Sequence, residues 1–146
     1  MKQPLRRIDV IALAPEGLEL IRAVPLFTPL PERSIERLAR SAVMVRFAAG
    51  ETVLTKGEAG DRFYVIESGR AEIVVSDDLS TFEEAGGSFG EIALLRDVPR
   101  QATVIATTDL VLRAIERRVF LAVVTGHEET EAEADRMITR MLVGVS

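Results

Sequence analysis

Residues 88–104 read SFGEIALLRDVPRQATV, and they place a carboxylate, Glu91, nine residues before a guanidinium, Arg100. Held at a fixed distance, the two groups could clamp a small ligand that carries hydroxyls and a phosphate. A carboxylate accepts hydrogen bonds, and a guanidinium can donate two at once to an anion. The pair could also be a plain salt bridge. Features elsewhere in the chain help to distinguish these two interpretations.

The residues between the two charges favour an anion site. Gly90 has no Cβ and lets a ligand approach the backbone closely. The apolar run 92–95 then predicts about one helical turn, whose first N–H groups have no internal partners and point outward. Arg100 would bring its guanidinium to the same anion.

Composition limits the classes of function. The 146 residues fit one domain with a single sizeable core, and 47% hydrophobic with 28% charged residues is typical of a soluble globular protein. A net charge of −5 excludes a general nucleic-acid binder, which needs a basic face. Arg makes up 16 of the 18 Lys and Arg residues, which suits bidentate contacts to phosphate or carboxylate or reflects codon composition.

Missing residue types narrow the chemistry further. The chain has no cysteine, which removes disulfides, thiolate metal sites and thiol catalysis and is compatible with a reducing cytoplasm. His127 is the only histidine, so neither a histidine metal cluster nor a histidine-based triad is available. The longest apolar runs are far too short to span a bilayer, and the N-terminus lacks the features of a signal peptide. We therefore expect a cytoplasmic protein that is not an enzyme and holds no metal or cofactor.

The elements that must position residues 88–104 are mostly short strands. Two short helices are expected first, one from Pro15 through Arg22 and one over residues 31–42. Strand-like runs follow at roughly ten-residue spacing, separated by glycines that suit tight turns; the runs are 43–47, 51–55, 61–68, 70–76, 80–85, 102–108 and 110–116. A helix over 117–126 and an amphipathic helix over 128–143 end the chain.

This order predicts a mainly β fold with flanking helices, a β-roll or jelly-roll barrel. We expect an N-terminal helical lead-in over residues 1–23, the roll over 24–126, and a C-terminal lid helix over 127–146.

The same order of elements resembles the cyclic-nucleotide-binding domain family. Residues 85–104, AGGSFGEIALLRDVPRQATV, are similar to the phosphate-binding cassette of the regulatory subunits of cAMP-dependent protein kinase. The upstream stretches VPLFTPLPERSIERLA and FAAGETVLTKGEAGDRFYVIESGRAEI also match, so the resemblance covers about residues 24–126. A lone Phe-Gly-Glu would be a weak signal, but its spacing to Pro-Arg within a glycine-punctuated roll is a strong one.

The resemblance implies a binding site for a cyclic nucleotide, cAMP ahead of cGMP. It assigns Glu91 to the ribose 2′-hydroxyl, Arg100 to the cyclic phosphate, and the backbone of Gly90, Ile92 and Ala93 to the sugar-phosphate. The expected ligand-binding residues are Phe89, Gly90, Glu91, Ile92, Ala93, Pro99, Arg100, Gln101 and Ala102. The family usually has a small residue after the Arg; here Gln101 could reach the phosphate, point to solvent, or crowd the site.

The apolar stripe of the last predicted helix is a candidate lid over the purine, formed by Met137, Ile138 and Met141 with Leu142. Arg136 or Arg140 could instead stack on the base, and the stripe could simply pack on the roll or mediate a homodimer. Binding would draw the cassette turn inward, and a hinge over residues 118–126 would let the last helix close.

Other readings stay open. A degenerate roll could act only as a protein-interaction or dimerisation module, and a related roll could bind another small anionic effector. A barrel metalloenzyme is discarded because the chain has a single histidine. The stretch APEGLELIRAVPLF resembles the cyclic-nucleotide domains that follow membrane transporters in bacterial proteins, so a transporter or another output domain could be covalently linked. We expect no nucleic-acid partner and no membrane insertion by this chain itself.

Overall fold

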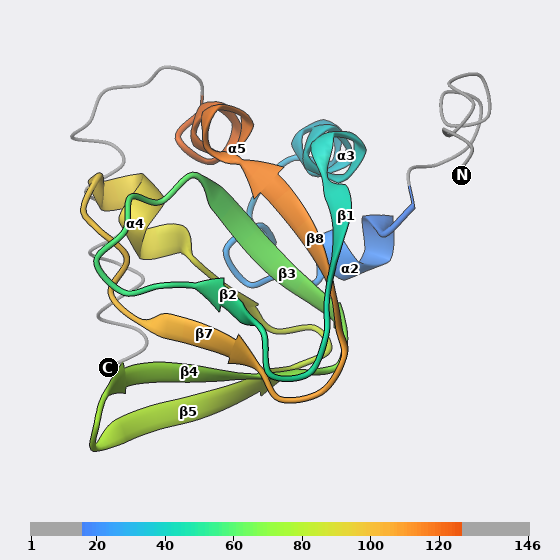
Figure 1. Ribbon diagram of the computed structural model, residues 1–146. Helices are drawn as coiled ribbons and strands as arrows, with labels where there is room; N and C mark the ends of the chain where they lie inside the picture. Colours follow the sequence, from blue (N-terminus) through green and yellow to red (C-terminus); the bar gives the residue numbers. More distant parts are fainter. Residues whose placement is uncertain (1–15, 127–146) are drawn as a thin grey trace, which may run out of the picture.

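The computed structural model describes residues 16–126 as a roll of two antiparallel sheets with helices on one side (Figure 1). The strands are β1 (Val43–Phe47), β2 (Thr52–Leu54), β3 (Arg62–Ser68), β4 (Arg70–Ser76), β5 (Leu79–Glu84), β6 (Ser88–Phe89), β7 (Thr103–Ala106) and β8 (Leu110–Glu116). The helices are α2 (Leu18–Arg22), α3 (Glu32–Ser41), α4 (Glu91–Arg96) and α5 (Arg117–Val124).

Each sheet has four strands, in the orders β1-β8-β3-β6 and β2-β7-β4-β5. Every pairing is antiparallel, and most partners are distant in sequence, as where Val43 of β1 lies opposite Ala114 of β8. Figure 1 shows α3 and α5 over the sheet that contains β1 and β8, with β4 and β5 on the far side of the roll. The cassette, which runs from β6 through α4 to β7, thus passes from one sheet to the other.

The strand β3 is buried on both faces because it lies between two cores. Tyr64 and Ile66 point to the core between the sheets. Phe63 and Val65 point to the core between the first sheet and the helices. Alternate side chains of a strand face opposite ways, so a nearly continuous apolar run fills both cores at once.

Three phenylalanines fix the helices to the roll. Phe63 of β3 stacks on Phe120 of α5 with ring centroids 4.9 Å apart, and Phe27 meets Phe63 edge-on at 5.4 Å. All three side chains are fully buried. This cluster anchors α5, the helix that directly follows the roll.

The predicted fold class, a mainly β roll with flanking helices, is confirmed. Each predicted strand has a counterpart within about two residues, a usual uncertainty for boundaries. The two-residue strand β6 was not predicted, and the helix predicted over 117–126 ends at Val124. The domain boundaries remain predictions. The expected lid helix, its residues Met137, Ile138 and Met141, and His127 lie outside the described residues.

No helix within residues 16–126 is long and apolar enough to cross a membrane.

Candidate functional site

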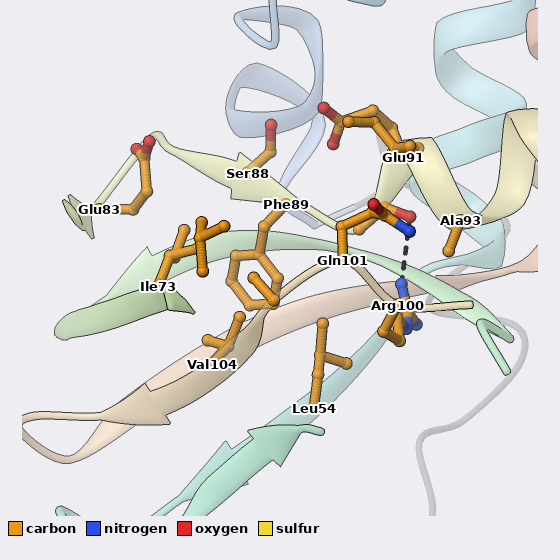
Figure 2. Close-up of a pocket in the computed structure, with 14 residues that line it drawn as sticks. Leu54, Ile73, Glu83, Ser88, Phe89, Glu91, Ala93, Arg100, Gln101 and Val104 are labelled. Carbon is orange, nitrogen blue, oxygen red and sulfur yellow. Dashed lines mark hydrogen bonds between the residues drawn. The ribbon is translucent and has the colours of Figure 1, made fainter. Parts of the chain in front are cut away.

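The cassette borders a cavity of about 340 Å³ that opens between the two sheets beside α4 (Figure 2). This volume is at the lower end of the range for small-molecule sites. The apolar lining comes from Leu54, Ile73, Val75, Phe89, Ile92, Ala93, Ala102 and Val104, together with Gly90. The polar lining comes from Glu83, Ser88, Glu91, Arg100 and Gln101. A mostly apolar wall with a few placed polar groups is the usual form of a ligand site.

Arg100 holds a buried positive charge at one end of this cavity. Its residue exposure is 4%, and its guanidinium donates to the carbonyl oxygens of Gly90 at 3.1 Å and Arg62 at 2.8 Å. The carboxylate of Asp61, which is itself exposed, lies 3.6 Å from the guanidinium. Burial lowers the pKa of Arg100 from its usual value, against the favourable charge of its neighbours. The hydrogen-bond partners of the guanidinium are neutral carbonyls, so its positive charge is only partly compensated. An anion in the cavity could therefore pair with it.

Two glycines make room for that guanidinium. A Cβ on Gly90, where φ is +103°, would lie 2.9 Å from Nη1 of Arg100. A Cβ on Gly60 would lie 2.7 Å from the Cβ of Ala93 and 3.2 Å from Cζ of Arg100. Gly90 therefore supplies both a left-handed conformation before α4 and the space in which Arg100 reaches its carbonyl.

Glu91 opens α4, the helical turn that the apolar run predicted. Gly90 is its N-cap residue, and among the described residues no side chain caps the helix. Burial raises the pKa of the Glu91 carboxyl; a hydrogen bond from its own backbone N–H opposes this, Glu83 raises the pKa further, and Arg100 lowers it. The carboxylate is thus a hydrogen-bond acceptor in a partly desolvated position.

Glu91 and Arg100 do not form a salt bridge with each other. The ion pair of Arg100 is with Asp61, and its hydrogen bonds go to backbone carbonyls. Figure 2 shows Glu91 and Arg100 as separate groups on the α4 side of the cavity, with the Arg100 hydrogen bond dashed. Both side chains line the same cavity, so one ligand could contact each of them.

Gln101 and Pro99 complete the loop after Arg100 in different ways. Gln101 lines the cavity but is exposed, and its side-chain amide donates to the Pro99 carbonyl at 2.8 Å. Pro99 itself is not part of the cavity lining, so the structure places it beside the site rather than in it. Of the nine predicted ligand-binding residues, the other eight line the cavity.

A short segment connects the Arg100 end of the cavity to α5. Arg100 contacts Asp61 and the carbonyl of Arg62. The Asp61 carbonyl accepts the backbone N–H of Arg117, the first residue of α5, at 2.9 Å. The guanidinium of Arg117 also pairs with Asp97, at the end of α4, at 2.9 Å. Residues 60–62 and the end of α4 are thus both in contact with the start of α5.

Six residues that line the cavity are not among the predicted ligand-binding residues: Leu54, Ile73, Val75, Glu83, Ser88 and Val104. Ile73 and Val75 are two residues apart on β4, and this spacing indicates that they share one face of the strand. Which face meets a cavity depends on how distant strands pair, as where Ile73 lies opposite Val104.

Comparisons with known proteins identify the family of this chain. The family model described as "Cyclic nucleotide-binding domain" matches residues 44–127. A cAMP-dependent protein kinase regulatory subunit from Mucor circinelloides f. lusitanicus is 42% identical over 92 residues, which is 63% of this chain and 22% of that protein. Another from Blastocladiella emersonii is 39% identical over 107 residues, 70% of this chain and 27% of that protein. The chain thus spans about a quarter of the length of these curated relatives.

Solved structures share the fold. The regulatory domain of Toxoplasma gondii protein kinase A, crystallised with cAMP, matches with a TM-score of 0.66 and 26% identity over 73% of this chain and 45% of that chain. The regulatory subunit of a cAMP-independent protein kinase A from Trypanosoma brucei matches with a TM-score of 0.73 over 91% of this chain and 48% of that chain; at 21% identity it supports the fold alone. By the extent of the family match, the chain belongs to the cyclic nucleotide-binding domain family.

Proposed function

We propose that the cavity beside α4 binds a cyclic nucleotide, cAMP in preference to cGMP, and that the domain is a regulatory sensor rather than an enzyme. The observation that carries this proposal is the buried guanidinium of Arg100, held by neutral carbonyls in the same cavity as the Glu91 carboxylate. One group suits a phosphate, and the other suits a sugar hydroxyl.

The proposed ligand lies with its cyclic phosphate at Arg100 and its ribose 2′-hydroxyl at Glu91. The backbone of Gly90, Ile92 and Ala93 surrounds the sugar-phosphate, and the purine packs on the apolar wall that includes Phe89 and Val104. The Toxoplasma gondii domain crystallised with cAMP and the relatives named as cAMP-dependent kinase regulatory subunits support this choice of ligand.

The proposed signal passes through α5. A phosphate at Arg100 would compete with the carbonyls of Gly90 and Arg62, and Arg117 connects residues 60–61 and the end of α4 to the start of α5. A ligand shifts such an equilibrium only by its difference in affinity for the two states. We place the base lid at Met137, Ile138 and Met141; packing against a second chain is the alternative for that stripe. A linked output domain and a cytoplasmic location remain proposals.

Calorimetric titration with cAMP and, separately, cGMP tests the proposal. Saturable binding of cAMP, tighter than that of cGMP, is expected. Thermal unfolding provides an independent check, because a ligand at about 100 times its dissociation constant adds about 2.7 kcal/mol of apparent stability. If neither nucleotide gives heat or a melting shift, the cassette does not bind a cyclic nucleotide, and the alternatives are a protein-interaction module or a site for another small anion.

A further inference from the structure

Glu83 places a carboxylate on the wall that β4 and β5 contribute to the cavity, where the other lining residues are the apolar Ile73 and Val75. It lies on β5 opposite Ala71 of β4, and Ala71 in turn lies opposite Ala106 of β7. Directly opposite residues of antiparallel strands point to the same face of a sheet, and both alanines are buried in the core between the sheets. The Glu83 side chain therefore points to the inner face and lines the cavity.

No described residue donates a hydrogen bond or an ion pair to the Glu83 carboxylate. Its neighbour on the other face, Glu84, pairs with Arg70 at 3.4 Å. Burial alone raises the pKa of the Glu83 carboxyl, because the side chain is partly removed from water without a donor in return. A polar group in such a position favours any ligand that brings the missing donor.

Glu83 and Arg100 lie at opposite ends of the cavity. Figure 2 shows Phe89, Ile73 and Val104 between them, with Glu91 on the α4 side. If the phosphate lies at Arg100 and the ribose at Glu91, as the proposed function has it, the base extends along this apolar wall toward Glu83. The base then presents one of its edges to the carboxylate.

Gly87 makes this position of the carboxylate possible. A Cβ on Gly87 would overlap the Oε1 atom of Glu83, so the carboxylate lies directly over the turn between β5 and β6. Ser88, the next residue, also borders the cavity, but it lies opposite Val65 of β3, so its side chain points to the helix side of the first sheet. Away from the α4 end, the polar side chain that the lining offers is therefore that of Glu83.

We propose that Glu83 accepts a hydrogen bond from the amino group of the purine and so selects for bases that carry one. An ionised carboxylate only accepts hydrogen bonds, and the exocyclic amino groups of adenine and guanine are donors. A site built around such a bond rejects an analogue that lacks the donor, since its polar group is then left unpaired. This inference rests on the proposed function, since the ligand must first be a nucleotide.

The test deletes the amino group and the carboxylate separately. Dissociation constants are measured by calorimetry for cAMP and purine riboside 3′,5′-cyclic monophosphate, which lacks the 6-amino group, and for cGMP and cIMP, which lacks the 2-amino group. The proteins are the wild type, Glu83→Ala and Glu84→Ala. The last is the matched control, because it removes the same charge from the outer face of the same strand.

In the wild type, loss of the amino group from at least one base should weaken binding about tenfold or more, the usual effect of a hydrogen bond to a charged group. For that base, the ligand with the amino group and the ligand without it should bind Glu83→Ala within about twofold of each other. Glu84→Ala should keep the wild-type preference. If deleting the amino group has equal effects in the wild type and Glu83→Ala for both bases, the inference is wrong while nucleotide binding stands. If the wild type binds none of the four nucleotides, the proposed function fails, and this inference fails with it.

Discussion

The guanidinium of Arg100 donates to the carbonyl oxygen of Gly90 at 3.1 Å, within the cassette that both residues frame. Gly90 has φ of +103°, and a Cβ there would meet Nη1 of Arg100 at 2.9 Å. The glycine and the arginine are thus interdependent: the first provides the space and the carbonyl, and the second fills that space with charge.

This dependence predicts a specific cost for Gly90→Ala. The positive φ alone should cost about 1–3 kcal/mol of unfolding free energy, and displacement of Arg100 should add about 1 kcal/mol or more. Gly57→Ala is the matched control, because Gly57 has φ of +95° with open space around it. Urea unfolding should show the larger loss for Gly90→Ala; equal losses would mean that contact with Arg100 is unimportant.

Glu91 should make stability depend on pH. Burial raises its pKa in the folded state, so the folded protein binds this proton more tightly than the unfolded chain does. The stabilisation that protonated Glu91 gives to the folded state is fully present below the unfolded pKa of about 4.3. It is lost as pH rises through the folded pKa. Glu91→Gln should therefore be more stable than the wild type at neutral pH, and the difference should shrink toward about pH 4. Urea unfolding at both pH values measures this, and a constant difference would argue against it.

Gln101 should have little influence on affinity. Its amide is occupied with the Pro99 carbonyl at 2.8 Å, and the residue is exposed. Gln101→Ala should leave the cAMP dissociation constant within about twofold, the range of an ordinary surface substitution. Calorimetry checks this, and a loss of tenfold or more would instead place the Gln101 side chain on the ligand.

Phe120 should be needed to hold α5 on the roll. Its ring is fully buried and stacks on Phe63 at 4.9 Å. Phe120→Ala should reduce the free energy of unfolding by about 3–5 kcal/mol. Arg118→Ala, in the same helix at a side chain that is 87% exposed, should change it by less than about 0.5 kcal/mol. Similar values for the two variants in urea unfolding would contradict this view of α5.

The residues on the α4 side of the cavity could be picked out from the sequence because their signals are local. Glycine before an acidic residue, a short apolar run and an arginine at fixed spacing all lie within one segment, and the structure gathers Gly90, Glu91 and Arg100 around one cavity. The strands are predicted by their composition and by the glycines between them.

The opposite wall of the cavity could not be predicted in the same way. In the sequence, Glu83 is one of several acidic residues on a predicted strand. Only its pairing with Ala71 in the structure shows which face of the sheet it occupies. That register depends on contacts between distant strands, which the period of a single strand does not specify. The strand β6 was missed for a simpler reason, because two residues carry no periodicity.

The most direct test of the central claim is the dissociation constant for cAMP of the wild type beside Arg100→Ala and Arg96→Ala. Arg96 lies in the same cassette but is exposed, so its removal controls for net charge. Thermal unfolding without ligand establishes that each variant is folded. We predict that Arg100→Ala weakens binding about thirtyfold or more, while Arg96→Ala binds like the wild type. Wild-type affinity in folded Arg100→Ala would contradict the assignment of Arg100 to the phosphate.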